Sequence, residues 1–66
     1  MVKITTDFIT LGQFLKLTDW IQSGGQAKVA VKELNITVNE IKENRRGRKL
    51  FKEDQVSVED KKYTIG

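Results

Sequence analysis

Basic side chains are concentrated in one short segment of this 66-residue chain. Residues 42–52 hold six lysines and arginines, including every arginine of the chain, and a single carboxylate, Glu43. The segment carries a charge of +5 on a chain whose net charge is +3, so the remaining residues sum to −2. An arginine guanidinium is a planar fork that contacts phosphate through two hydrogen bonds and also stacks on bases. We therefore predict contact with a polyanion, such as nucleic acid, through Arg45, Arg46, Arg48 and Lys49.

Two other interpretations fit the same segment. A charged loop can simply be solvated, although solvated loops usually mix charges of both signs, and residues 44–52 carry none but positive ones. A nuclear localisation signal also matches, but that pattern has low specificity. Gly47 would let the loop bend so that several guanidinium groups converge, which favours nucleic-acid contact.

Two segments have the sequence of a helix start. Thr10-Leu11-Gly12-Gln13 and Ser23-Gly24-Gly25-Gln26 both match the capping box, in which a hydroxyl and a Gln side chain each bond a backbone amide of the other residue. Helix N-termini attract phosphate, and glycine there costs roughly 1 kcal/mol against alanine. The glycines indicate either close backbone approach by a ligand or a tight loop or helix-packing contact. We predict that phosphates contact the amides of Ser23, Gly24, Gly25 and Gln26, with Gln13, Lys16 and Lys28 alongside.

The composition excludes most catalytic chemistry. The chain has no Cys and no His, so it lacks a thiol nucleophile, a Cys/His metal site and the usual general base. Its carboxylates are scattered at turns, without a spacing that favours acid–base catalysis. We therefore expect no cofactor, no small-molecule substrate and no enzymatic activity. No stretch resembles a membrane span or a secretion signal, so we expect a cytoplasmic protein that does not engage a membrane.

The elements that must position these residues can be predicted from the hydrophobic periodicity. Residues 2–9 indicate a strand or extended arm, and apolar residues spaced by three and four predict helices from Leu11 and from residues 27–33. Asn35 would end the second helix in the left-handed conformation. A period of two then predicts short strands at 36–38, 56–58 and 63–65, with a tight turn at residues 39–40. The length allows one small domain, residues 1–66, of the α+β class: two short helices packed on a small, curved, mostly antiparallel sheet.

The aromatic residues are few, and their positions in the sequence do not suggest a platform for bases. A platform for unpaired bases needs exposed aromatic rings on adjacent strands. We expect Phe14 and Trp20 to pack in the core, and the sequence leaves Phe8 undecided. The sequence therefore favours recognition of nucleic-acid backbone and shape over the stacking of bases.

Three separated segments together resemble a known family. They are residues 9–16, the start at 23–28 and the run Asn44-Arg45-Arg46-Gly47-Arg48-Lys49-Leu50, followed by residues 54–58. This pattern resembles the RNA-binding domain first seen in ribosomal protein S-four, the alpha-L motif, and is similar to its small stand-alone, YaaA-like bacterial members. The family usually has Gly where this chain has Glu40 and Glu53, so either turn should differ in type or carry strain. A basic residue common at the first helix start is here Thr10 or Leu11, which shifts the ionic contacts to the lysines and the arginine loop.

The resemblance implies a non-enzymatic domain that binds structured RNA, often ribosomal or transfer RNA. We further expect a monomer that is associated with the ribosome. The alternative is a protein-interaction module whose basic loop docks on an acidic protein surface. Both partners are polyanions, so composition does not separate them.

Overall fold

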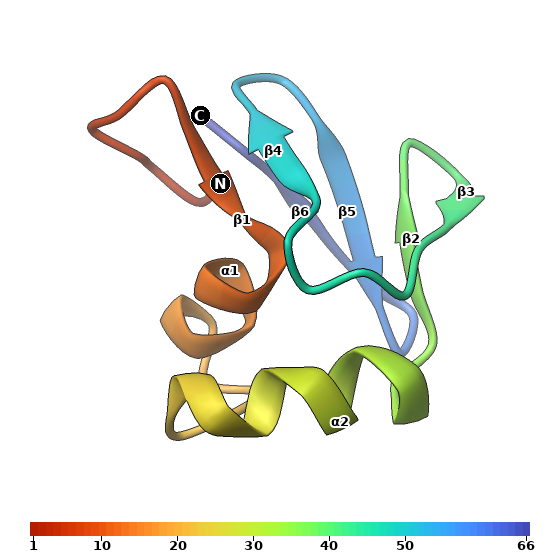
Figure 1. Ribbon diagram of the computed structural model, residues 1–66. Helices are drawn as coiled ribbons and strands as arrows, with labels where there is room; N and C mark the ends of the chain where they lie inside the picture. Colours follow the sequence, from red (N-terminus) through yellow and green to blue (C-terminus); the bar gives the residue numbers. More distant parts are fainter.

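The computed structural model describes residues 1–66 and places two short helices beside two small antiparallel sheets (Figure 1). This arrangement confirms the predicted α+β class with short helices against antiparallel strands. A 3₁₀ turn (η1) directly precedes the second helix, so the two form about three turns in succession. The elements in chain order are β1 (Phe8–Thr10), α1 (Leu11–Leu17), η1 (Gly24–Gln26), α2 (Ala27–Glu33), β2 (Ile36–Val38), β3 (Ile41–Lys42), β4 (Lys49–Phe51), β5 (Gln55–Val58) and β6 (Lys61–Thr64).

The six strands form two separate sheets. One sheet has the order β3-β2-β5-β6, and the other pairs β1 with β4 across about forty residues of sequence. Val2 forms a parallel bridge to Ile65, so the two ends of the chain lie side by side (Figure 1). The α-helices are each seven residues long, and none has the length and apolar character of a membrane-crossing helix.

The core is built from the alternating positions of the strands and one face of each helix. Ile36, Val38, Val56 and Val58 are buried on the inner face of the larger sheet, while the residues between them are half-buried. Leu50 of β4 is fully buried between the two exposed residues that flank it. From the helices, the buried residues are Leu11, Phe14, Leu15, Ala27 and Val31. The apolar residues that predicted the helices therefore face the core. A chain of this length has only a small core, so each amphipathic helix must turn its apolar face toward it.

Trp20 and Tyr63 close one side of this core. The Trp20 Nε1–H donates to the Tyr63 hydroxyl at 3.1 Å, and the Tyr63 ring meets the Phe14 ring edge-on at 5.2 Å between centroids. Phe14 is fully buried and Trp20 packs half-buried against the core, which confirms the expectation for both residues.

Several predicted boundaries are wrong. The N-terminal arm forms strand only at Phe8–Thr10, and the last strand covers Lys61–Thr64 instead of residues 63–65. The second helix ends at Glu33 as predicted, but Asn35 is not left-handed, because the chain leaves the helix through an extended Leu34 with φ −80° and ψ 147°. Val29 of α2 lies outside the buried stripe and is 56% exposed.

The turns take the left-handed conformation without glycine. Asn39 and Glu40 have φ values of 51° and 71° and join β2 to β3 in a tight hairpin, as predicted. Glu53 has a φ of 78°, and the pair Glu59–Asp60 turns the chain between β5 and β6 in the same region. The two glutamates that stand where the family usually has glycine therefore keep the glycine-like backbone, which carries strain for an L-residue.

Candidate nucleic-acid interface

The basic loop, residues 43–48, is attached to the start of α1. The Leu11 amide donates to the Arg48 carbonyl oxygen at 2.8 Å, and the Gly12 amide donates to the Arg46 carbonyl oxygen at 2.9 Å. These amides have no acceptor within the helix, so the loop carbonyls satisfy two of the groups that every helix N-terminus leaves unpaired. In Figure 1 the loop crosses from the β2–β3 hairpin toward α1 before it enters β4. The backbone of the loop is thus fixed to the start of α1.

The Thr10 capping box completes this helix start. The Thr10 amide donates to Gln13 Oε1 at 2.8 Å, and the Gln13 amide donates to the Thr10 hydroxyl at 3.2 Å. The predicted box is therefore present in both directions. Because every early amide of α1 has an acceptor inside the chain, this helix start offers no free donor to a phosphate.

Glu43 organises the basic loop from within. It is the one buried charged residue, and its carboxylate accepts from the Asn44 and Arg45 amides, from Arg45 Nε at 2.9 Å and from Arg48 Nη1 at 2.8 Å. The Arg45 hydrogen bonds, helped by Arg48 and opposed by burial, lower the pKa of Glu43 from 4.5 to about 2. The carboxylate therefore stays ionised and holds Arg45 and Arg48 in one geometry, a role that the sequence analysis did not foresee.

The remaining cations of the predicted site have no acidic partner. Only Arg45 and Arg48 form ion pairs, both with Glu43. Lys16, Lys28, Arg46 and Lys49 are exposed and lie outside ion-pairing distance of any carboxylate. Their charges are uncompensated, as a surface that binds a polyanion requires.

The start of the second helix differs from the first. Gln26 Oε1 accepts from the Gln22 amide at 2.6 Å and the Ser23 amide at 3.1 Å, and the Gln26 amide donates to the Ser23 carbonyl oxygen at 3.1 Å. Two of the four amides predicted to contact phosphate are thus bonded inside the chain. The amides of Gly24 and Gly25 are exposed and have no acceptor.

A shallow hollow brings the two predicted halves of the site together. It has a volume of about 340 Å³ and is bounded by both helix starts and the basic loop. We call it the basic hollow. Its lining residues are Thr10, Gly12, Gln13, Lys16, Gly24, Ala27, Arg46 and Gly47. The predicted convergence of the basic loop with the start of the second helix is therefore present, through Arg46, Gly47 and Gly24.

Glycines do two different things around the basic hollow. At Gly12 a Cβ atom would lie 3.2 Å from the Ala27 Cβ and 3.5 Å from the Arg46 carbonyl oxygen, so the close packing of α1, α2 and the loop needs a glycine there. At Gly24, Gly25 and Gly47 a Cβ would meet almost nothing, and none of these residues has a positive φ. The fold itself does not require the last three glycines.

Comparisons with known proteins identify the family to which this chain belongs. A family model described as S4 domain matches residues 2–66. This chain belongs to the S4 domain family. It is 55% identical over 58 residues to a protein of Bacillus subtilis strain 168 named "Probable ribosome maturation protein RlbA", and the alignment covers 88% of this chain and 82% of the relative. No solved structure is significantly similar to it. The resemblance to the ribosomal S-four-type domain is thereby confirmed.

The other predicted residues of this S4 domain do not line the basic hollow, and Gly25 and Gln26 line a separate hollow together with Glu33. Lys28 projects from α2, and Arg45 and Arg48 are turned toward Glu43. Lys49 lies on β4 with its ammonium 4.8 Å from the centre of the Phe8 ring. The hollow itself brings together Gln13, Lys16, Gly24 and Arg46.

Two exposed aromatic rings of this S4 domain lie on adjacent strands, which the sequence did not predict. Phe8 of β1 and Phe51 of β4 are direct partners in the two-stranded sheet, 37% and 48% exposed, with ring centroids 5.7 Å apart. The pairing joins residues 43 positions apart, so no local pattern shows it. In the sequence, each of the two phenylalanines is only seen to stand next to an aliphatic residue, Ile9 or Leu50. These two aliphatic residues are buried in the structure.

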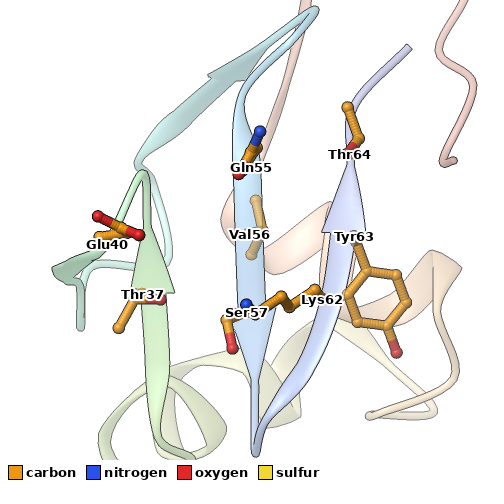
Figure 2. Close-up of a pocket in the computed structure, with 8 residues that line it drawn as sticks. All are labelled: Thr37, Glu40, Gln55, Val56, Ser57, Lys62, Tyr63 and Thr64. Atoms are coloured by element: carbon orange, nitrogen blue, oxygen red, sulfur yellow. The ribbon is translucent and has the colours of Figure 1, made fainter.

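A second hollow of the S4 domain lies on the outer face of the larger sheet (Figure 2). Thr37, Ser57 and Lys62 occupy adjacent positions on β2, β5 and β6, and Lys62 extends over the strand that carries Ser57. Its charged residues are Lys62 and Glu40, which have opposite signs. It does not have the excess of positive charge found in the basic hollow.

Proposed function

We propose that this S4 domain is a non-enzymatic, ribosome-associated protein that binds structured RNA through the basic hollow and the residues around it. The observation that carries the proposal is the convergence of Arg46, Lys16 and the free Gly24 amide on one hollow with no carboxylate. The name of the Bacillus subtilis relative supports ribosomal RNA over transfer RNA as the target. The proposed contacts are Gln13, Lys16, Ser23, Gly24, Gly25, Gln26, Lys28, Arg45, Arg46, Arg48 and Lys49.

The proposed binding mode is recognition of backbone and shape. Phosphates would accept hydrogen bonds from the Gly24 and Gly25 amides, while Arg46 and Lys16 neutralise their charge. Ser23 and Gln26 would act indirectly, because their hydrogen bonds hold the backbone that presents those amides. Contacts of this kind position RNA without reading its sequence. A ribosome-associated role would be carried out in the cytoplasm, and we propose a monomer.

The salt dependence of binding tests the proposal. Four uncompensated cations predict a slope of roughly −3 to −4 for the logarithm of affinity against the logarithm of salt concentration, at about 0.7 to 0.9 per phosphate. We expect filter binding with hairpin fragments of ribosomal RNA to give this slope, and a DNA duplex of equal length to bind more weakly. Arg46→Ala should weaken every RNA alike and reduce the slope by roughly 0.7 to 0.9.

Lys62→Ala is the matched control, because it removes the same charge from the outer face of the larger sheet. It should leave the slope unchanged. Binding without salt dependence, or an equal effect of the two variants, would reject the basic hollow as the RNA site. Strong binding to an acidic protein, with no preference for RNA, would favour the interaction-module alternative.

A further inference from the structure

The aromatic pair, Phe8 and Phe51, is an exposed apolar feature that the proposed phosphate contacts do not use. The rings lie opposite each other on β1 and β4 with an angle of 50° between their planes. The residues next to them, Ile9 and Leu50, face the core from the other side of the strands and are buried. A pair of exposed phenylalanine rings at one register position leaves apolar surface in water, which the fold itself does not need.

The aromatic pair is continuous with the basic hollow. Alternate residues of a strand share a face, so Thr10 lies on the same face as Phe8, and Lys49 lies on the same face as Phe51. Thr10 and Lys49 are themselves register partners, and Thr10 lines the basic hollow. Two residues of strand span about 7 Å, so the rings begin close to where the hollow ends.

The charges around the aromatic pair favour an anionic, ring-bearing ligand. The Lys49 ammonium lies 4.8 Å from the Phe8 ring centre and has no carboxylate partner. Asp54, in the turn after Phe51, is engaged within the chain, because it accepts from the Phe51 amide at 2.8 Å and from the Asn39 side chain at 3.1 Å. Asp7 and Glu53 are exposed and form no ion pair with Lys49. Aromatic rings beside unpaired cations are the arrangement by which proteins hold single-stranded nucleic acid.

We infer that the aromatic pair stacks on an unpaired base that flanks the structured RNA bound in the basic hollow, while Lys49 contacts the phosphate of that nucleotide. Phe51 is the more exposed ring and offers the larger stacking surface. This inference rests on the proposed function, since the same RNA must occupy both places. Stacking tolerates any base, so the site selects for an unpaired nucleotide next to a helix and not for a sequence.

Three synthetic RNAs test the inference: one hairpin with blunt ends, the same hairpin with a five-nucleotide unpaired tail, and the same hairpin with a tail of abasic nucleotides. The abasic tail keeps the phosphates and removes the bases. We expect the natural protein to prefer the tail with bases over the abasic tail by about fivefold or more, the lower end of the range for stacking one base. Phe51→Leu should abolish that preference and leave binding to the blunt hairpin within about twofold of the natural protein.

Two further variants make the result decisive. Phe51→Trp keeps an aromatic face and should retain the preference, whereas a purely apolar contact would accept Leu as readily as Trp. Ile41→Ala removes an apolar side chain that is 71% exposed on β3, in the other sheet, and should change nothing. Circular dichroism melts of each variant show whether a change in binding accompanies a change in folding.

The possible failures are distinguishable. Equal binding of the two tails by the natural protein, with salt-dependent binding to the blunt hairpin intact, overturns stacking and leaves the proposed function standing. An equal loss on all three RNAs in Phe51→Leu also overturns it. If Phe51→Leu binds every RNA normally but no longer co-sediments with ribosomal subunits, the pair docks on protein and the inference is wrong. Absence of binding to any RNA rejects the proposed function and the inference together.

Discussion

Replacing Gly24 by alanine should raise the stability of the protein and lower its affinity for RNA. A Cβ atom at this position would meet no other atom within 4 Å, and the residue does not have a positive φ. Alanine therefore fits the folded backbone and restricts the unfolded chain, which stabilises a protein by about 0.4–1 kcal/mol. A domain of this size gains roughly 4–8 °C in Tm per kcal/mol, so Gly24→Ala should raise Tm by roughly 2–8 °C.

The effect on RNA binding should have the opposite sign. Gly24 lines the basic hollow, and its amide and that of Gly25 have no acceptor within the chain. A methyl group there would stand between the backbone and an approaching phosphate. The loss of one amide–phosphate hydrogen bond, with a net worth of about 0.5–1.5 kcal/mol, weakens binding roughly two- to tenfold.

Thermal melts followed by circular dichroism, and filter binding to the blunt hairpin, measure both effects on one preparation. Gly12→Ala is the contrasting variant, because its Cβ would press on the Ala27 Cβ, which cannot rotate away from helix α2. Its Tm should fall. A lower Tm for Gly24→Ala would show that the fold needs this glycine, and unchanged RNA affinity would show that no phosphate approaches its backbone. Either result refutes the reasoning.

Two further predictions concern stability. Glu43→Gln should lower the free energy of unfolding by about 1–3 kcal/mol at pH 7, since it removes charged hydrogen bonds to Arg45 and Arg48. Because folding lowers the pKa of Glu43 from 4.5 to about 2, its contribution is fully present above pH 4.5 and is lost as the pH falls toward 2. Urea titrations across that range should show the two proteins converging, and a constant difference would contradict this assignment. Glu40→Gly should raise the free energy of unfolding in the same titrations by about 0.5–1 kcal/mol, because glycine tolerates a φ of 71° better than an L-residue does. An unchanged or lower free energy of unfolding would contradict strain at this turn.

The features that the sequence predicts well are those fixed by neighbours a few residues apart. The Thr10 box, the buried stripe of α1 and the hairpin at Asn39–Glu40 all follow from contacts within four residues or from short periodicity. Asn35 shows where this reasoning stops. Its left-handed tendency was a local preference, but the chain leaves α2 at Leu34 in an extended conformation and runs straight into β2.

The features that the sequence does not predict depend on contacts between distant segments. Phe8 and Phe51 become neighbours only because β1 pairs with β4, and that pairing joins residues on either side of both helices. In the sequence, Glu43 is only the single negative charge within the basic residues 42–52. Its burial, which the fold imposes by tying its amide to the Ile36 carbonyl oxygen at 3.0 Å, turns it into the acceptor that orders the loop.

The two helix starts, nearly identical in sequence, have separate roles because the fold treats them differently. At α1 the carbonyl oxygens of Arg46 and Arg48 occupy the first two amides, so the partial positive charge of that helix end is satisfied by the chain itself and anchors the basic loop. At the second start the amides of Gly24 and Gly25 have no acceptor in the chain, and Gly24 lines the same hollow as Arg46. One capping motif thus anchors the basic loop, and the other leaves two amide donors without an acceptor.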